Sequence, residues 1–126
     1  MIVDTSAIVA IARKEPEAER LLDKLREAGT SLMSVASFVE LTIVLRAEAS
    51  VEQIESVLAG LGIKFVPVDA AQAGAAAGAY RRYGRGSGHP AKLNYGDAFT
   101  YALTATRGHS LLFVGDDFGH TDLPAA

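Results

Sequence analysis

The sequence predicts a layered α/β domain with a mainly parallel sheet. Two observations predict this class: four short apolar runs alternate with longer segments of helical periodicity, and most of the helical segments begin at residues that commonly cap helices. Strands separated by helices are joined by crossover connections, which place neighbouring strands parallel. At 126 residues the chain, 1–126, is expected to form a single domain.

The first part of the chain predicts two strands and three helices. Pro16 suits a first helical position, and leucines follow it at helical spacing until Gly29. Ser34 is placed to cap the next helix, which is strongly apolar. In order, the expected elements are a strand over 1–3, a helix over 5–13, a helix from Pro16 to 28, a strand over 31–33 and a helix over 35–46.

The rest of the chain predicts three more helices and two more strands. Ser50 with Gln53 has the spacing of a capping box, Asp69 with Gln72 is a further capping pair, and Asn94 is placed to cap the last helix. In order, the expected elements are a helix over 51–61, a strand over 63–68, a helix over 70–83, a loop over 84–90, a helix over 95–107, a strand over 111–114 and a turn over 115–122.

Composition excludes several classes of function. The chain has no cysteine, which excludes disulfides, thiolate catalysis and cysteine-based zinc sites. The N-terminal segment lacks the pattern of an export signal, since an aspartate comes early and the cations follow the apolar stretch. No uncharged apolar run approaches the roughly 18 residues that a membrane span needs. We therefore expect a cytoplasmic protein.

Charge is unevenly distributed along the chain. The net charge is −3, but no acid occurs between Asp69 and Asp97. A locally positive surface that suits a polyanionic partner is therefore compatible with the negative total, although these side chains could equally be a solvated helix end and loop. The basic residues of this interval are Arg81, Arg82, Arg85, His89 and Lys92.

Five acids have no evident ion-pair partner in the sequence. Glu40 lies in an apolar helix with no cation one turn away, where a carboxylate pays a desolvation cost unless its edge reaches water. Asp4 ends the first strand and could simply cap the next helix, and Asp97 stands in a first helical turn, where the helix dipole favours an anion. Asp116 and Asp117 follow the last strand and could be mere loop polarity.

The positions of these acids together favour a metal site. In a parallel sheet the carboxyl ends of the strands and the helices that follow them lie along one edge, where ligands bind. Carboxylates gathered there repel one another unless a divalent cation neutralises them. Oxygen ligands without cysteine or suitably spaced histidine favour Mg²⁺ or Mn²⁺ over Zn²⁺, and such ions bridge phosphate oxygens and activate water.

The whole chain resembles the PIN domains, and within them the VapC-type toxins of bacterial toxin–antitoxin pairs. The resemblance rests on MIVDTSAIVAI at the start, the glutamate of SVASFVE, the distinctive segment from Arg81 to Ala102 and LLFVGDDFGHTD near the end. It implies a three-layer α/β/α PIN-like domain with a central, mainly parallel sheet of four to five strands. It also implies an endoribonuclease, a homodimer and a cognate VapB-type antitoxin.

The resemblance assigns roles to individual residues. Asp4, Glu40 and Asp97 match the acids with which the family builds its metal site, Asp4 and Asp97 being the expected ligands of Mg²⁺ or Mn²⁺. Either Asp116 or Asp117 supplies a fourth acid, with Asp117 preferred. Thr5 or Ser6 would supply a supporting hydroxyl. We expect hydrolysis to 5′-phosphate and 3′-hydroxyl ends, with flanking phosphates held by Arg81, Arg82, Arg85 and Lys92.

Three other interpretations of the function remain. A phosphatase with Asp4 as nucleophile would need a second aspartate two residues later, where this chain has Ser6. A catalytically silent PIN-like module would bind RNA or an antitoxin without cleaving anything, which the presence of acids at all four places disfavours. A receiver-type signalling domain lacks a suitably placed lysine.

Overall fold

Four parallel strands form the centre of the molecule, in the order β3-β2-β1-β4. The computed structural model describes all residues, 1–126. Register is set by the pairs Ile2–Leu32, Ile2–Leu111 and Ser31–Ile63. A single bridge between Leu111 and Ala125 extends the sheet beyond β4. The predicted parallel sheet is confirmed, with the strands β1 Ile2–Val3, β2 Ser31–Ser34, β3 Ile63–Val66 and β4 Leu111–Leu112.

Six α-helices and one 3₁₀ helix connect and cover these strands. They are α1 Thr5–Ala12, α2 Ala18–Ala28, α3 Val35–Val44, α4 Val51–Gly60, α5 Ala70–Tyr83, α6 Tyr95–Arg107 and η1 Phe118–His120. The predicted caps are present: Ser34 Oγ accepts from Ala36 N at 3.2 Å, and Ser50 with Gln53 forms a capping box. No helix is long and apolar enough to cross a membrane.

The prediction for the start of α2 was wrong. The helix begins at Ala18, two residues after Pro16. The backbone N–H of Ala18 donates to Glu15 O at 3.0 Å, so Pro16 occupies the second position of a tight turn. Proline suits that position as well as it suits a first helical residue, because both require a similar φ.

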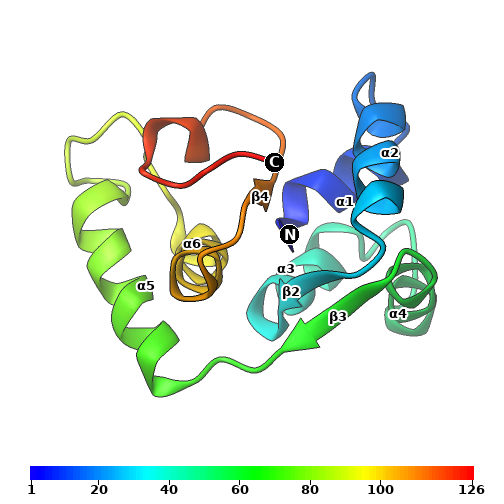
Figure 1. Cartoon of the computed structure of the whole chain (residues 1–126), viewed down its shortest axis with the longest axis horizontal. Coiled ribbons are helices and arrows are strands. Elements are labelled where there is room, and N and C mark those ends of the chain that lie inside the picture. The colour runs from blue at the N-terminus through cyan, green and yellow to red at the C-terminus, as the bar shows by residue number, and fades with distance from the viewer.

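Alternate residues of the strands point into two separate cores. Val3 and Leu112 pack with side chains of α1, α2, α3 and α4, whereas Ile2 and Leu111 pack with side chains of α5, α6 and η1. Figure 1 shows α5 and α6 on one side of the sheet and α1, α2 and α4 on the other. Because successive strand residues face opposite sides, the fold has the three layers expected of it.

Candidate active site

Asp4 follows β1 and is almost completely buried, with 3% of its surface exposed. Its Oδ2 accepts a hydrogen bond from Ser6 N at 3.0 Å, and its Oδ1 accepts one from Thr100 Oγ1 at 2.7 Å. The first bond is the helix cap that the sequence suggested. The second fixes the carboxylate against α6, so Asp4 both caps α1 and belongs to the candidate site.

The two hydroxyl residues after Asp4 have different partners. Thr5 Oγ1 donates to Ser37 O at 3.1 Å and lies near the Glu40 carboxylate, where it partly offsets the rise in pKa that burial causes. Ser6 Oγ accepts from Val114 N at 3.0 Å, which ties the end of β4 to α1. Of the two, Thr5 therefore lies at the acids, whereas the Ser6 hydroxyl serves the backbone.

Glu40 projects from α3 toward the beginning of α6. A Cβ atom placed on Gly96 would overlap the Glu40 carboxylate, so the absence of a side chain at Gly96 makes room for it. Burial raises the pKa of Glu40, and the negative charge of Asp4 raises it further. An apolar helix thus carries its one acid into a site that already contains another.

Asp97 joins the other acids from the first turn of α6. It forms a capping box with Asn94, in which Asp97 Oδ2 accepts from Asn94 N at 2.9 Å and Asn94 Oδ1 accepts from Asp97 N at 2.8 Å. The pKa of Asp97 is raised to about 7, chiefly by burial and further by the charges of Asp4, Glu40 and Asp117, while the bond from Asn94 partly opposes the rise. Four carboxylates from distant parts of the chain therefore converge.

The Gly-Asp-Asp turn brings only one of its two acids into this group. Asp117, directly before η1, is close enough to influence the pKa of Asp97. Both side chains are exposed, but Asp116 is not among the charges that affect Asp97 and does not line the neighbouring cleft. The geometry thus favours Asp117 over Asp116 as the fourth acid.

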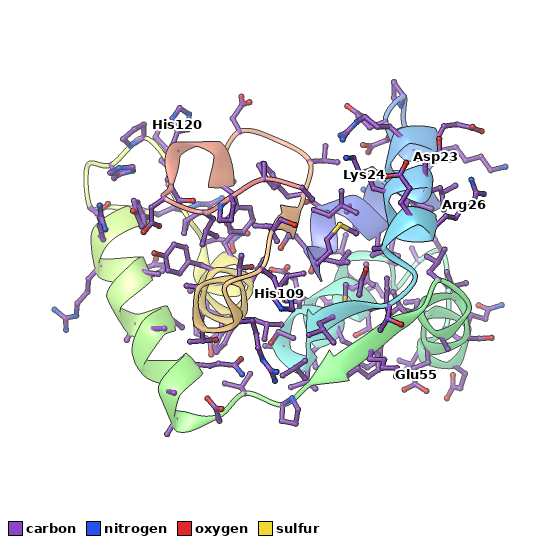
Figure 2. The ribbon with its side chains drawn as sticks, in the orientation of Figure 1. Asp23, Lys24, Arg26, Glu55, His109 and His120 are labelled. Carbon is purple, nitrogen blue, oxygen red and sulfur yellow. The ribbon has the colours of Figure 1, made fainter.

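None of these acids is paired with a cation. The ion pairs of the chain are Arg13–Glu48 and Arg26–Asp23, both at the surface. Figure 2 shows Asp23 and Arg26 together on α2, and His109 and His120 at separate places, both histidines being exposed. Buried carboxylates without a counter-charge are costly, which makes a bound cation or a proton the natural partner of this group.

The donor set fits a hard divalent cation that keeps part of its water. No three acidic or histidine side chains are close enough to form a complete ligand set by themselves. Mg²⁺ does not need one, since it is usually held by one or two carboxylates together with water and substrate phosphates. Asp4 and Asp97 are both oriented by hydrogen bonds and both buried, and Asp97 Oδ1 accepts no hydrogen bond from the chain.

The basic residues divide into two groups. Arg85 and Lys92 line a cleft of about 760 Å³ whose wall includes Asp117. The Arg82 guanidinium instead lies over the Tyr83 ring, 4.7 Å from its centre. The pKa of Asp122 is lowered chiefly by a hydrogen bond from Tyr101, and the charge of Arg82 contributes to this shift. Arg81 is exposed and does not line the cleft. Two of the four predicted phosphate-holding residues thus line a cleft together with Asp117.

Sequence reasoning missed three residues that position the acids. They are Thr100, which bonds to Asp4; Ser37, whose Oγ lies 3.0 Å from Thr100 Oγ1; and Gly96, which accommodates Glu40. Thr100 follows Asp97 by three positions and so shares its helix face, which was the available signal. The contacts of Ser37 and Gly96 join α3 to α6 and left no trace in local sequence.

The chain matches known proteins over nearly its full length. The family model for the PIN domain matches residues 1–123. Ribonuclease VapC42 of Mycobacterium tuberculosis is 49% identical over 129 aligned positions, covering 100% of this chain and 98% of the relative. Ribonuclease VapC30 of the same organism is 44% identical, covering 98% of this chain and 95% of the relative.

A solved structure shares the fold. The crystal structure of Mycobacterium tuberculosis VapC20, described as a sarcin–ricin loop cleaving toxin, superposes with a TM-score of 0.76. The alignment covers 99% of this chain and 97% of that one, at 14% sequence identity. At this identity the likeness concerns the arrangement of helices and strands alone.

Proposed function

The chain belongs to the PIN-domain family and, within it, to the VapC ribonucleases, and from this we infer that Asp4, Glu40, Asp97 and Asp117 form the centre that cuts RNA. The observation that carries this proposal is the convergence of Asp4, Glu40 and Asp117 on the buried Asp97, whose pKa their negative charges help to raise. Asp97 is thus a buried carboxyl surrounded by three other acids with no cation among them. Such an arrangement is typical of functional sites, where a bound ion neutralises the charge.

The proposed cofactor is Mg²⁺, or Mn²⁺, held by Asp4 and Asp97. When bound, the ion neutralises carboxylates and polarises the scissile phosphodiester. The hydrogen bonds from Thr100 and Ser6 to Asp4, and from Asn94 to Asp97, hold both carboxylates in fixed orientations before RNA arrives. Fixed ligands of this kind reduce the reorganisation that catalysis would otherwise require.

Glu40 and Asp117 are the proposed proton-handling groups. Their carboxylates flank Asp97 from two different elements, and burial raises the pKa of Glu40 toward the range of a useful general base. One of them accepts a proton from the attacking water as the oxygen of that water bonds to phosphorus. The bond from phosphorus to the 3′ oxygen then breaks, and this oxygen takes up a proton from solvent water. One fragment of the internal cut therefore ends in a 5′-phosphate and the other in a 3′-hydroxyl.

The VapC ribonucleases are toxins, and the proposed partner of this chain is a cognate VapB-type antitoxin. A second proposed contact is a homodimer. It is supported by an apolar surface on α3 and α6, where Val39, Ile43, Val44 and Tyr95 are exposed by 53%, 55%, 38% and 77%. Contiguous exposed apolar side chains of this kind commonly mark protein interfaces. Light scattering should give twice the monomer mass, and Ile43→Arg should give the monomer.

The activity is tested with Asp97→Asn. The asparagine keeps an oxygen for the Asn94 capping bond but removes the charge, so the variant should fold and fail to cleave RNA. The matched control is Asp69→Asn, which makes the same change at another helix cap, where Asp69 Oδ1 accepts from Gln72 N at 2.8 Å. The control should remain active and lose its activity in EDTA. An active Asp97→Asn variant, or wild-type cleavage in EDTA, would remove the metal mechanism.

The alternatives are distinguished by the same assay. A silent module would bind RNA or an antitoxin and show no Mg²⁺-dependent cleavage. An aspartate-nucleophile phosphatase is disfavoured because the second position after Asp4 holds Ser6, whose hydroxyl accepts from Val114 N.

A further inference from the structure

The cleft beside Asp117 is built almost entirely by one loop, residues 84–93, between α5 and α6. Its lining consists of Arg85, His89 and Lys92 with two glycines and Pro90, and Asp117 stands at its edge. Figure 1 shows this loop at the end of α5, next to the segment that carries η1. The cleft thus has basic groups along its wall and one acid where it meets the site described above.

The loop is held in one shape by its own hydrogen bonds. Its two ends pair as Arg85 N to Leu93 O and Leu93 N to Tyr83 O, each at 2.9 Å. Inside the loop, Ser87 Oγ donates to Gly84 O at 2.6 Å. Leu93 is completely buried. The loop backbone that carries Arg85 and Lys92 is therefore held in a fixed conformation.

Lys92 adopts a backbone conformation that lysine rarely adopts. Its φ is +48°, in the left-handed region, and its side chain is exposed between the completely buried Ala91 and Leu93. Glycine or asparagine would fit this backbone more readily, and residues in such conformations cluster at functional sites. The fold turns the chain here so that two neighbours point inward and the ammonium group points out.

His89 is fixed in one tautomer. Its Nδ1 accepts a hydrogen bond from Ala91 N at 3.1 Å, so in the neutral ring the proton is on Nε2. The ring packs edge-on against Tyr83, with 4.7 Å between ring centres. His89 therefore presents an N–H donor alongside the two cations of the cleft.

We propose that Arg85, His89 and Lys92 form a preformed subsite for a phosphodiester of single-stranded RNA that neighbours the scissile one. The proposal rests on the function proposed above and adds His89 as a binding residue, while it leaves Arg81 and Arg82 outside the RNA path. None of the three side chains is in an ion pair within the chain. Asp117, the one acid in the lining, repels a phosphate, so the phosphate is expected at the three basic side chains.

The charge contribution is tested by comparing Lys92→Asn with Lys14→Asn. Lys14 has the same charge and a φ of +52°, and it lies in the turn after α1. Figure 1 shows α1 away from the loop between α5 and α6. Asparagine tolerates the left-handed backbone at both positions. In an Asp97→Asn background that leaves RNA intact, binding of a fluorescein-labelled single-stranded RNA is followed by anisotropy at several salt concentrations.

Lys92→Asn should weaken binding about tenfold and reduce the slope of log affinity against log salt by about 0.7, the share of one phosphate contact on a single strand. Lys14→Asn should change neither. Equal behaviour of the two variants would overturn the subsite. If Lys92→Asn fails to fold, Arg85→Gln, at an exposed side chain, provides the same comparison.

The role of His89 is tested by two substitutions. One retains the hydrogen-bond acceptor that Nδ1 provides, and the other retains the donor that Nε2 provides. In His89→Asn the side-chain oxygen can accept from Ala91 N in place of Nδ1, but the outward N–H is lost. We expect the loop to fold normally and KM for RNA to rise several-fold, with kcat unchanged. His89→Gln supplies a donor at the reach of Nε2 and should recover part of that loss. An unchanged KM in His89→Asn would remove His89 from the subsite.

These outcomes are separate from those that test the activity. If the wild-type protein fails to cleave RNA with Mg²⁺, the proposed function fails whatever the loop does. If it cleaves and the loop variants bind and cleave as wild type does, the subsite alone is wrong.

Discussion

Thr100 Oγ1 donates a 2.7 Å hydrogen bond to Oδ1 of Asp4, across 96 positions of sequence. Because the Thr100 proton is used on Asp4, the Ser37 hydroxyl, 3.0 Å away, donates to Thr100 in turn. All three side chains are buried, and they come from the end of β1, from α3 and from α6. This chain of bonds orients the carboxylate that is proposed to hold the metal.

Thr100→Val should reduce both stability and cleavage. Valine has nearly the same shape but leaves Asp4 Oδ1 and the Ser37 hydroxyl without a buried partner, which costs about 1–3 kcal/mol of unfolding free energy. Misorientation of Asp4 should lower the cleavage rate at least tenfold, about 1.4 kcal/mol of barrier. Urea unfolding and a fluorogenic RNA assay measure the two effects.

The matched control is Thr104→Val, one turn further along α6. Thr104 is equally buried, but its hydroxyl donates to the backbone carbonyl of Thr100 at 2.8 Å and contacts no acid. Cleavage by this variant should match the wild type. If both variants cleave normally, the bond between Thr100 and Asp4 does not matter for the reaction.

Gly96→Ala should impair cleavage far more than folding. Alanine is favoured over glycine within a helix by about 1 kcal/mol, but here its Cβ would displace the Glu40 carboxylate. We expect a large loss of kcat with a small change in melting temperature. Gly78→Ala in α5 is the control, since a Cβ at Gly78 meets nothing within 4 Å. That variant should be slightly more stable and fully active; a fully active Gly96→Ala would contradict the placement of Glu40.

Stability without metal should fall as pH rises. The folded chain raises the pKa of Asp97 from 3.8 to about 7, so it holds the proton more tightly than the unfolded chain does. The favourable contribution is present in full below 3.8 and is lost progressively as pH rises through about 7, where Asp97 ionises. Thermal melts in EDTA across this range, with Asp97→Asn as the comparison, measure the effect. A wild-type profile that matches that of Asp97→Asn would refute the pKa assignment.

Mg²⁺ should reverse this loss, and do so most strongly above pH 7. Only the ionised carboxylate binds the cation, and at a hundredfold excess over its dissociation constant a ligand specific for the folded state stabilises it by about 2.7 kcal/mol. Melting temperature against Mg²⁺ concentration gives the affinity. An equal effect of Mg²⁺ on Asp97→Asn would place the ion elsewhere.

Local patterns in the sequence predicted most of the fold. Helix caps such as Ser34 and Asn94 are decided within three or four residues, so their hydrogen bonds were predictable. Pro16 was ambiguous, because a tight turn and the start of a helix require a similar φ. Parallel pairing followed from the alternation of strands and helices, because crossovers leave few other arrangements.

The site was predictable only in outline. The acids could be selected because each lacked a cation nearby in sequence, and the parallel fold placed their elements at one sheet edge. Which residues orient them could not be predicted, since Thr100 bonds to Asp4 and Gly96 receives Glu40 across distances in sequence that no local pattern records. The packing of Arg82 on Tyr83, which turns it from the cleft, is equally non-local.

Anomalous diffraction from crystals soaked in Mn²⁺ above pH 7 is the most direct test of the convergence of acids. The account predicts a peak beside Asp4 and Asp97, about 2 Å from their carboxylate oxygens, with Glu40 and Asp117 facing it. Crystals of Asp97→Asn treated in the same way should lose the peak. A wild-type map with no peak among these side chains, or with the carboxylates turned toward arginine or lysine partners, would contradict it.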